Sequence, residues 1–265
     1  MGIFAVAVVA GLFGSMLGVG GGIIMVPVLT LAFGAPIKVA IATSIVCVIA
    51  TSTMAQTSFV SRGMTNVRLG MLLEVATTVG AVAGGITAVL ISGRVLQGCF
   101  AVVLVYVAWM MNRRGADAVP VRTGVLEARY HDPVAGDVVY GVKRLELGFF
   151  LSLAAGNVSG LLGVGGGAFK VPIMNMLMGI PIKATIATSN LMIGVTAATG
   201  AAIFYGRGYM DPHLVVPAAL GILFGARFGP ALAVRLSARA LGVIFQVVLL
   251  AFAALMIVQA AGVTL

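Results

Sequence analysis

Two glycine-rich stretches of identical sequence carry the backbone groups best placed to bind a ligand. GVGGG occurs at Gly18–Gly22 and again at Gly163–Gly167, and apolar sequence flanks both copies. Consecutive glycines leave backbone N–H and C=O groups open, and a hydrocarbon environment excludes such groups unless protein or a water-filled cavity surrounds them. Paired breaks at corresponding positions of two halves are a usual sequence sign of a transporter binding site.

Each glycine break precedes an apolar segment of only 11 residues, Ile23–Phe33 and Ala168–Met178. At about 1.5 Å per residue such a segment rises about 16 Å, half of a bilayer core of about 30 Å. Half-helices that begin at these loops would direct unpaired N–H groups and positive dipole ends into the protein centre, which suits an anion. The alternative is that the glycines only permit close helix packing. The glycines expected to line a binding site are Gly20, Gly21, Gly22, Gly165, Gly166 and Gly167.

Three charged residues lie within apolar segments. Lys170 is in the first turn of the second half-helix, where the dipole disfavours a cation by about 0.3–1 kcal/mol and a bound anion would offset that cost. Its alternatives are snorkelling to water or pairing with a carboxylate. Arg227 marks the substrate pathway, or it has a structural role, paired with Glu74 or satisfied by backbone groups. Glu74 can carry a coupling proton, or it is an interfacial carboxylate because Arg68 is six residues away.

Hydroxyl and amide side chains follow the half-helices and either complete a ligand shell or join helices by hydrogen bonds: Thr43, Ser44, Thr188, Ser189, Asn190 and, within the second half-helix, Asn175. The sequence shows no metal, catalytic or cofactor constellation, and GVGGG lacks the Lys-Ser/Thr that follows in a P-loop. We therefore expect no enzyme activity, no cofactor and no metal. Cys47 and Cys99 are expected to be small apolar side chains.

The chain contains two diverged copies of one unit. At an offset of 145 residues, Gly11–Ser44 aligns with Gly156–Ser189 without a gap, and 17 of 34 positions are identical. Their shared frame is G-(x5)-LGVGGG-(x3)-VP-(x6)-G-x-PIK-x-x-IATS. Met25 stands in the first copy where Lys170 stands in the second. We expect a first membrane repeat at 1–111, a polar, cytoplasmic connecting loop at 112–144 and a second membrane repeat at 145–265.

Composition sets the fold class. The chain has 265 residues, of which 61% are hydrophobic and 9% charged, with a mean hydropathy of +1.16. A soluble domain typically has about 25% charged residues, so we predict an all-α integral membrane protein. Basic residues outnumber acidic ones to give a net charge of +9, and the largest cluster of basic residues lies in the connecting loop, where the positive-inside rule explains it without nucleic acid. The first apolar run, Gly2–Leu17, lacks a basic leader and a cleavage site, so we expect it to remain in the mature protein.

The expected full spans are 37–60, 69–91 and 95–111 in the first copy, and 184–204, 214–233 and 240–260 in the second. If the run before each glycine break forms a re-entrant hairpin with the half-helix, the repeats are inverted; if that run crosses fully, they are parallel. The inverted arrangement places eleven Lys and Arg of the links on one side against three, whereas the parallel one gives nine against five. The charge rule favours inverted repeats with both termini outside.

The repeated LGVGGG-(x3)-VP-(x6)-G-x-PIK-x-x-IATS frame resembles the TauE/SafE family of sulfite and organosulfonate exporters, also called the four-toluene-sulfonate uptake permease family. The resemblance covers nearly the whole chain. It implies a multi-pass protein of a prokaryotic cytoplasmic membrane that moves a small anion, such as sulfite or sulfoacetate, without hydrolysing ATP. We expect secondary transport by alternating access around a midplane site, with the anion, the lipid bilayer and a coupling proton or sodium ion as partners. A passive anion channel is the alternative.

Overall fold

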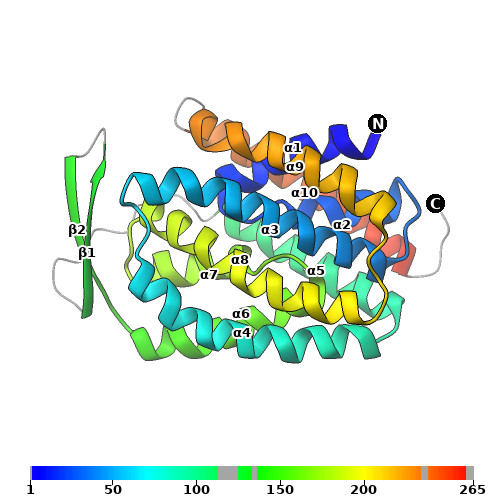
Figure 1. Ribbon diagram of the computed structural model, residues 1–265, viewed down its shortest axis with the longest axis horizontal. Coiled ribbons are helices and arrows are strands. Elements are labelled where there is room, and N and C mark those ends of the chain that lie inside the picture. The colour runs from blue at the N-terminus through cyan, green and yellow to red at the C-terminus, as the bar shows by residue number, and fades with distance from the viewer. Residues whose placement is uncertain (1, 113–124, 133–135, 234–237, 261–265) are drawn as a thin grey trace.

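The computed structural model describes all residues except 1, 113–124, 133–135, 234–237 and 261–265. Its elements follow the chain in this order: α1 (Gly2–Leu17), α2 (Gly22–Leu31), α3 (Ile37–Ser61), α4 (Val67–Leu90), α5 (Gly93–Asn112), β1 (Val125–Asp132), β2 (Gly136–Val142), α6 (Leu145–Leu162), α7 (Gly167–Pro172), the π-helical turn η1 (Ile173–Leu177), α8 (Ile182–Gly206), α9 (Pro212–Ala233) and α10 (Ala238–Ala260). The helices form one elongated body with the strands at one end (Figure 1).

The 145-residue offset of the sequence repeat recurs in the element boundaries. Helices α3 and α8 begin at Ile37 and Ile182, and α4 and α9 begin at Val67 and Pro212. The counterpart of α2 is α7 followed by η1, so the second half-helix changes from α to π geometry after its first six residues. Both half-helices are as short as the sequence predicts.

The two copies interlock rather than stand side by side. Helix α1 of the first copy packs along α9 of the second, and α6 of the second packs along α4 of the first. Glycines allow these helices to approach at backbone distance: a Cβ on Gly84 of α4 would overlap the carbonyl oxygen of Asn157, and one on Gly225 of α9 would overlap that of Val8. Small residues at such contacts are typical of helices that associate in membranes.

In the described part of the chain, six helices are long and apolar enough to cross a bilayer. The protein is therefore an all-α integral membrane protein, as the composition predicts. The set of helices long enough to span a bilayer differs from the expected set at one helix. Leu145–Leu162, which the inverted arrangement makes an arm of a re-entrant hairpin, is among the six, and the described part of the expected span 240–260 contains the apolar segment Gln246–Ala260.

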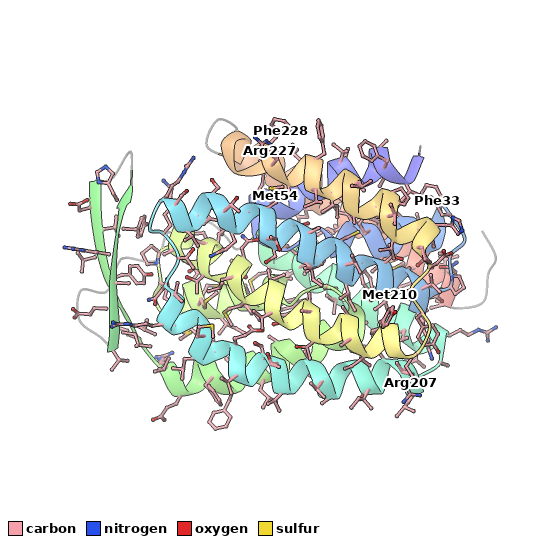
Figure 2. The ribbon with its side chains drawn as sticks, in the orientation of Figure 1. Phe33, Met54, Arg207, Met210, Arg227 and Phe228 are labelled. Atoms are coloured by element: carbon pink, nitrogen blue, oxygen red, sulfur yellow. The ribbon has the colours of Figure 1, made fainter. Side chains whose placement is uncertain are left out.

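The start of α1 and the end of α10 lie at one end of the molecule, while the strands and the α3–α4 connection lie at the other (Figure 1). Arg207, one of the three basic residues expected outside, lies at the end away from the strands (Figure 2). Inverted repeats require this separation of the termini from the connecting segment. The inversion itself stays a prediction.

The segment 112–144, expected as a polar loop, contains an antiparallel hairpin of β1 and β2 in which Ala128 pairs with Tyr140. Its inner face is apolar: Tyr130 and Tyr140 are buried in a cluster with Met174 and Met178. The N–H of Lys143 donates to the carbonyl oxygen of Met178 at 3.1 Å. The hairpin thus covers the end of the second half-helix.

Candidate functional site

The two glycine breaks meet in the interior of the protein. A Cβ on Gly165 would lie 2.5 Å from Val48 Cγ1 and 2.7 Å from Ile193 Cγ2, and a Cβ on Gly20 would meet the same two side chains at 3.1 and 3.3 Å. A Cβ on Gly22 would lie 2.8 Å from the carbonyl oxygen of Gly163. The breaks therefore contact each other, and Val48 and Ile193, themselves 145 residues apart, lie against both.

Backbone conformation explains why these positions are glycine. Gly21 and Gly166 precede the two half-helices with φ of 71° and 74°, and Gly165 has φ of 77°. This left-handed region is strained for residues with a Cβ. The first hydrogen bonds that close the half-helices are donated by Ile24 and Phe169, so the amides before them have no acceptor within the helix.

One serine of each copy donates a hydrogen bond to the glycine break of the other copy. Ser44 Oγ donates to the carbonyl oxygen of Gly163 at 2.9 Å, and Ser189 Oγ donates to that of Gly18 at 3.5 Å. Both the serines and the glycines are equivalent at the 145-residue offset, so the bonds are reciprocal. Thr188 Oγ1 accepts the backbone N–H of Asn66 at 3.0 Å. Ser44, Ser189 and Thr188 thus make the helix-to-helix bonds that were the alternative to a ligand shell.

Thr43 and Asn190 differ from these three. Both are fully buried, and Thr43 Oγ1 and Asn190 Oδ1 have no hydrogen-bond partner among the described residues. The amide nitrogen of Asn190 donates to the carbonyl oxygen of Ile186 at 2.9 Å. Because buried polar atoms usually have a hydrogen-bond partner, these two oxygens are available to a ligand.

Lys170 is the charged group closest to a glycine break. Its side chain is 1% exposed, and its stem passes beside the loop, with Cε 3.3 Å from the position of a Cβ on Gly166. The ammonium donates to Thr196 Oγ1 at 2.7 Å and to Glu74 Oε2 at 3.4 Å. The pairing with a carboxylate, one of the alternatives raised by the sequence, is the arrangement observed.

Glu74 is buried inside the protein. Its side chain is 6% exposed, and hydroxyl groups surround it: Thr196 donates to Oε1 at 2.6 Å and Thr77 to Oε2 at 2.7 Å. Glu74 is thus shielded from solvent, and the choice between a coupling carboxylate and an interfacial one, suggested by the nearby Arg68, stays a prediction. The sequence did not single out Thr196 or Thr77, although the i, i+3 spacing of Glu74 and Thr77 places both on one helix face.

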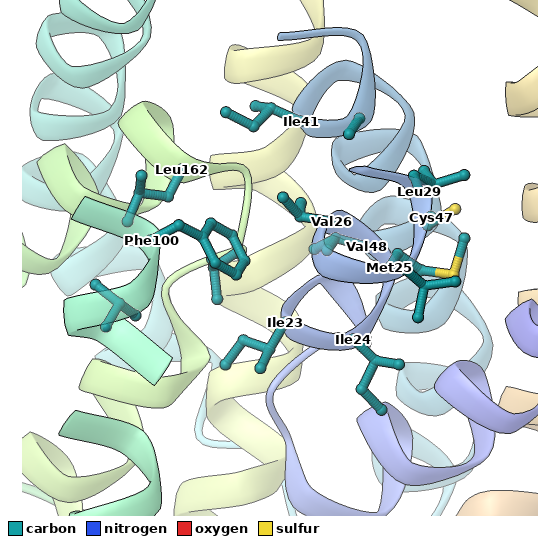
Figure 3. Close-up of a cluster of buried hydrophobic side chains, with 14 of the residues drawn as sticks. Ile23, Ile24, Met25, Val26, Leu29, Ile41, Cys47, Val48, Phe100 and Leu162 are labelled. Carbon is teal, nitrogen blue, oxygen red and sulfur yellow. The ribbon is translucent and has the colours of Figure 1, made fainter. Parts of the chain in front are cut away.

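The ion pair has no equivalent in the other half of the molecule. At the 145-residue offset, Met25 stands for Lys170 and Ala219 stands for Glu74, while Thr51 matches Thr196. Met25 lies on α2 in a cluster of apolar side chains that includes Val48 (Figure 3). The positions equivalent to Lys170 and Glu74 thus carry uncharged residues, and Met25 packs in the apolar core.

Arg227 lies outside this site. Its side chain is exposed on α9 beside Phe228, at the outer edge of the molecule (Figure 2). Among the described residues Glu74 forms its ion pair with Lys170, so the structural pairing of Glu74 with Arg227 considered from the sequence is not formed. Asn175 instead serves the end of the half-helix, where its amide donates to the carbonyl oxygen of Ile180 at 2.9 Å.

The glycines of both breaks are buried, and side chains of α3 and α8 lie against them. A cavity of about 400 Å³ lies between α1, α2 and α10, and its lining is apolar: Ala5, Val6, Val9, Phe13, Ile24, Val28, Val248 and Phe252. None of the break glycines belongs to that lining.

Comparison with known proteins gives one consistent result. The family model described as "Sulfite exporter TauE/SafE" matches residues 3–256. The chain is 24% identical over 253 residues to "Probable membrane transporter protein YunE" of Bacillus subtilis, covering 91% of each. It is also 24% identical over 260 residues to "Probable membrane transporter protein MJ0441" of Methanocaldococcus jannaschii, covering 92% of this chain and 90% of that protein. No solved structure matches.

Proposed function

The chain belongs to the TauE/SafE sulfite exporter family, and we propose that it is a secondary transporter of a small anion, a sulfur oxyanion or organosulfonate such as sulfite or sulfoacetate. The protein is a membrane transporter of the prokaryotic cytoplasmic membrane, as its family and its bacterial and archaeal relatives indicate. The substrate and the mechanism are our proposal. The observation that carries it is the buried Lys170 beside the glycine break.

A buried ammonium is expensive in a membrane protein, and such groups usually mark ion or substrate pathways. Lys170 is buried next to backbone amides that have no acceptor within the half-helix. An ammonium and free N–H groups at one place form a binding site for an oxyanion. The other copy shows that the fold is compatible with Met25 at this position, which supports a functional role for the charge.

We place the anion between Lys170 and the loop Gly165–Gly167, with Gly20–Gly22 of the first copy opposite. Thr43 has a hydroxyl free to donate to an oxygen of the anion, whereas the Asn190 Oδ1 only accepts and would pair with a protonated ligand such as hydrogensulfite. The break glycines and Lys170 are buried in this conformation, so binding requires one part of the repeat pair to move against the other. Movement of this kind is alternating access.

The proposal is tested by flux into proteoliposomes that contain the purified protein. Sulfite, sulfoacetate, methanesulfonate and sulfate are compared, with pH and sodium gradients imposed separately. A secondary transporter accumulates at least one sulfur anion against its gradient when the coupling gradient is present. Flux that only dissipates the anion gradient under every condition would assign the channel alternative instead.

Lys170→Met copies the first repeat and provides the variant for this test. We expect it to lower sulfite flux by at least tenfold while Arg227→Gln, on the exposed surface, retains wild-type flux. Equal flux in the Lys170→Met variant and the wild type would remove Lys170 from the substrate site. No flux of any of the four anions in the wild type would contradict the proposed substrate class.

A further inference from the structure

The Lys170–Glu74 ion pair lies buried between the two copies of the repeat. Resting on the function proposed above, we propose that a proton binds Glu74 when the anion binds Lys170, so that the protein moves one proton with each monovalent anion and no net charge. The argument depends on the contacts of the two side chains, on the hydroxyl groups around them and on their burial.

In the closed conformation the charges cancel within the pair. Lys170 has its ammonium 3.4 Å from the Glu74 carboxylate, and both side chains are almost completely buried. An anion that entered beside Lys170 would meet the carboxylate at close range, and two like charges in a poorly screened interior repel each other strongly. The anion and the ionised Glu74 are therefore alternative partners of the same ammonium.

Protonation of Glu74 resolves this competition. The carboxylate binds H⁺ and becomes a neutral carboxylic acid, Lys170 remains an ammonium, and the incoming anion takes the place of the carboxylate. The site is neutral before binding and neutral afterwards when the anion carries one charge. Release of the anion on the other side is matched by release of the proton, which restores the ion pair.

The groups around Glu74 suit both protonation states. Thr196 and Thr77 approach its two oxygens with hydroxyl groups at 2.6 and 2.7 Å, and Thr78 reaches Oε1 at 3.3 Å. A hydroxyl donates to a carboxylate and can also accept from a carboxylic acid, whereas a backbone N–H or a guanidinium could only donate. This shell therefore allows the proton to bind without leaving a buried group unpaired.

The described elements packed against Glu74 bring no second charge to it. Helix α7 contributes Lys170 and α8 contributes Thr196. Helix α6 approaches this part of α4 through Gly156, whose Cβ would overlap the carbonyl oxygen of Thr77, and farther along through Gly160. Protonation of Glu74 thus removes the anionic partner of the Lys170 ammonium.

The test measures whether a membrane potential affects accumulation in proteoliposomes. The probes are methanesulfonate and, at mildly acidic pH, hydrogensulfite, because both are monoanions; protein-free liposomes correct for leakage. An inside-negative potential of about 100 mV is worth about 2.3 kcal/mol per elementary charge, which corresponds to a roughly 50-fold lower accumulation of an anion that travels alone. We expect the wild type to accumulate either probe to the same level, within twofold, with and without the potential.

Glu74→Gln keeps the size of the side chain and cannot ionise, so it should carry the anion without the proton. We expect the potential to lower its accumulation by more than tenfold, while Glu146→Gln, at an exposed carboxylate in the first turn of α6, behaves as the wild type. Strong voltage dependence of the wild type would overturn the coupling, and that result does not depend on whether the Glu74→Gln variant folds.

The two proposals fail in different ways. Wild-type flux that depends on voltage as in Glu74→Gln leaves anion transport intact and removes only the coupled proton. Absence of sulfur-anion flux in the wild type overturns the proposed function and the coupling with it. A Glu74→Gln variant that folds and remains insensitive to voltage would also overturn the role of Glu74.

Discussion

Replacing both members of the buried ion pair should cost far less stability than replacing either one. Lys170→Met leaves the Glu74 carboxylate without its cation, and Glu74→Gln leaves the Lys170 ammonium without its anion, in a site where both side chains are almost completely buried. Removal of one partner of a buried pair typically costs about 3–5 kcal/mol, whereas an uncharged replacement of both partners is often neutral or stabilising. In the double variant the hydroxyl groups of Thr77 and Thr196 still reach the amide of the glutamine.

These free energies translate into shifts of the melting temperature. At about 2–4 °C for each kcal/mol in a chain of this size, each single variant should melt about 6–20 °C below the wild type, and the double variant within about 5 °C of it. The first repeat provides the precedent, since Met25 occupies the position equivalent to Lys170 in an apolar cluster.

The chain contains its own reporter for this assay. Cys47 is fully buried in α3, so a thiol-reactive dye labels it when the protein unfolds. Cys99 is only partly buried and is replaced by alanine to remove its background. Melting curves of the four proteins in detergent then give the interaction energy of the pair. A double variant destabilised by the sum of the two single effects would refute the reasoning, because the two side chains would then act independently.

Three further predictions concern single positions. Gly165→Ala should destabilise the protein by about 1–3 kcal/mol more than Gly34→Ala. Both glycines have positive φ, but only the added Cβ at Gly165 meets Val48. Equal melting temperatures of the two variants would contradict the packing of the break. Arg227→Gln should change stability by less than about 0.5 kcal/mol and sulfite flux by less than twofold, and a larger loss of flux would return Arg227 to the substrate pathway. Burial raises the pKa of the Tyr140 phenol. The stability that this phenol contributes is therefore present below its ordinary pKa of about 10 and is lost as the pH rises through the raised value. Tyr140→Phe should remove this alkaline decline in melting temperature, and an unchanged decline would exclude Tyr140 as its source.

The repeat and the helix boundaries could be predicted from the sequence because they depend on local composition. Glycine breaks, the turn at Pro36 and the length of apolar runs each act within a few residues. The offset of 145 residues then extends to elements such as α3 and α8, which both contain 25 residues. Membrane helices of this kind are defined by their own hydrophobic length, so long-range contacts change their limits little.

The ion pair could not be predicted because its members come from different copies. Lys170 and Glu74 are 96 residues apart, and only the packing of α4 against the second copy brings them together. The local neighbour Arg68 suggested an interface instead. Opposite charges inside two apolar spans were the available signal, and the sequence paired Glu74 with Arg227, whose side chain the structure exposes.

The hairpin was missed because the whole connecting segment was judged by its polarity. Within it, Leu126, Ala128 and Tyr130 alternate with charged or polar residues, which is the two-residue period of a strand with one buried face. Gly136 has φ of 75° at the start of β2. This alternation over the eight residues Val125–Asp132 is the sequence signal that predicts β1.

The most direct measurement of the central claim is a structure of the purified protein with selenite, whose selenium atom marks the position of the anion by its anomalous scattering. We predict a selenium peak between the loop Gly165–Gly167 and Lys170, within about 4 Å of the ammonium nitrogen, with Glu74 turned away from the cation. A selenium peak elsewhere in the membrane body, with Lys170 still bound to Glu74 and Thr196, would contradict an anion site at the glycine breaks.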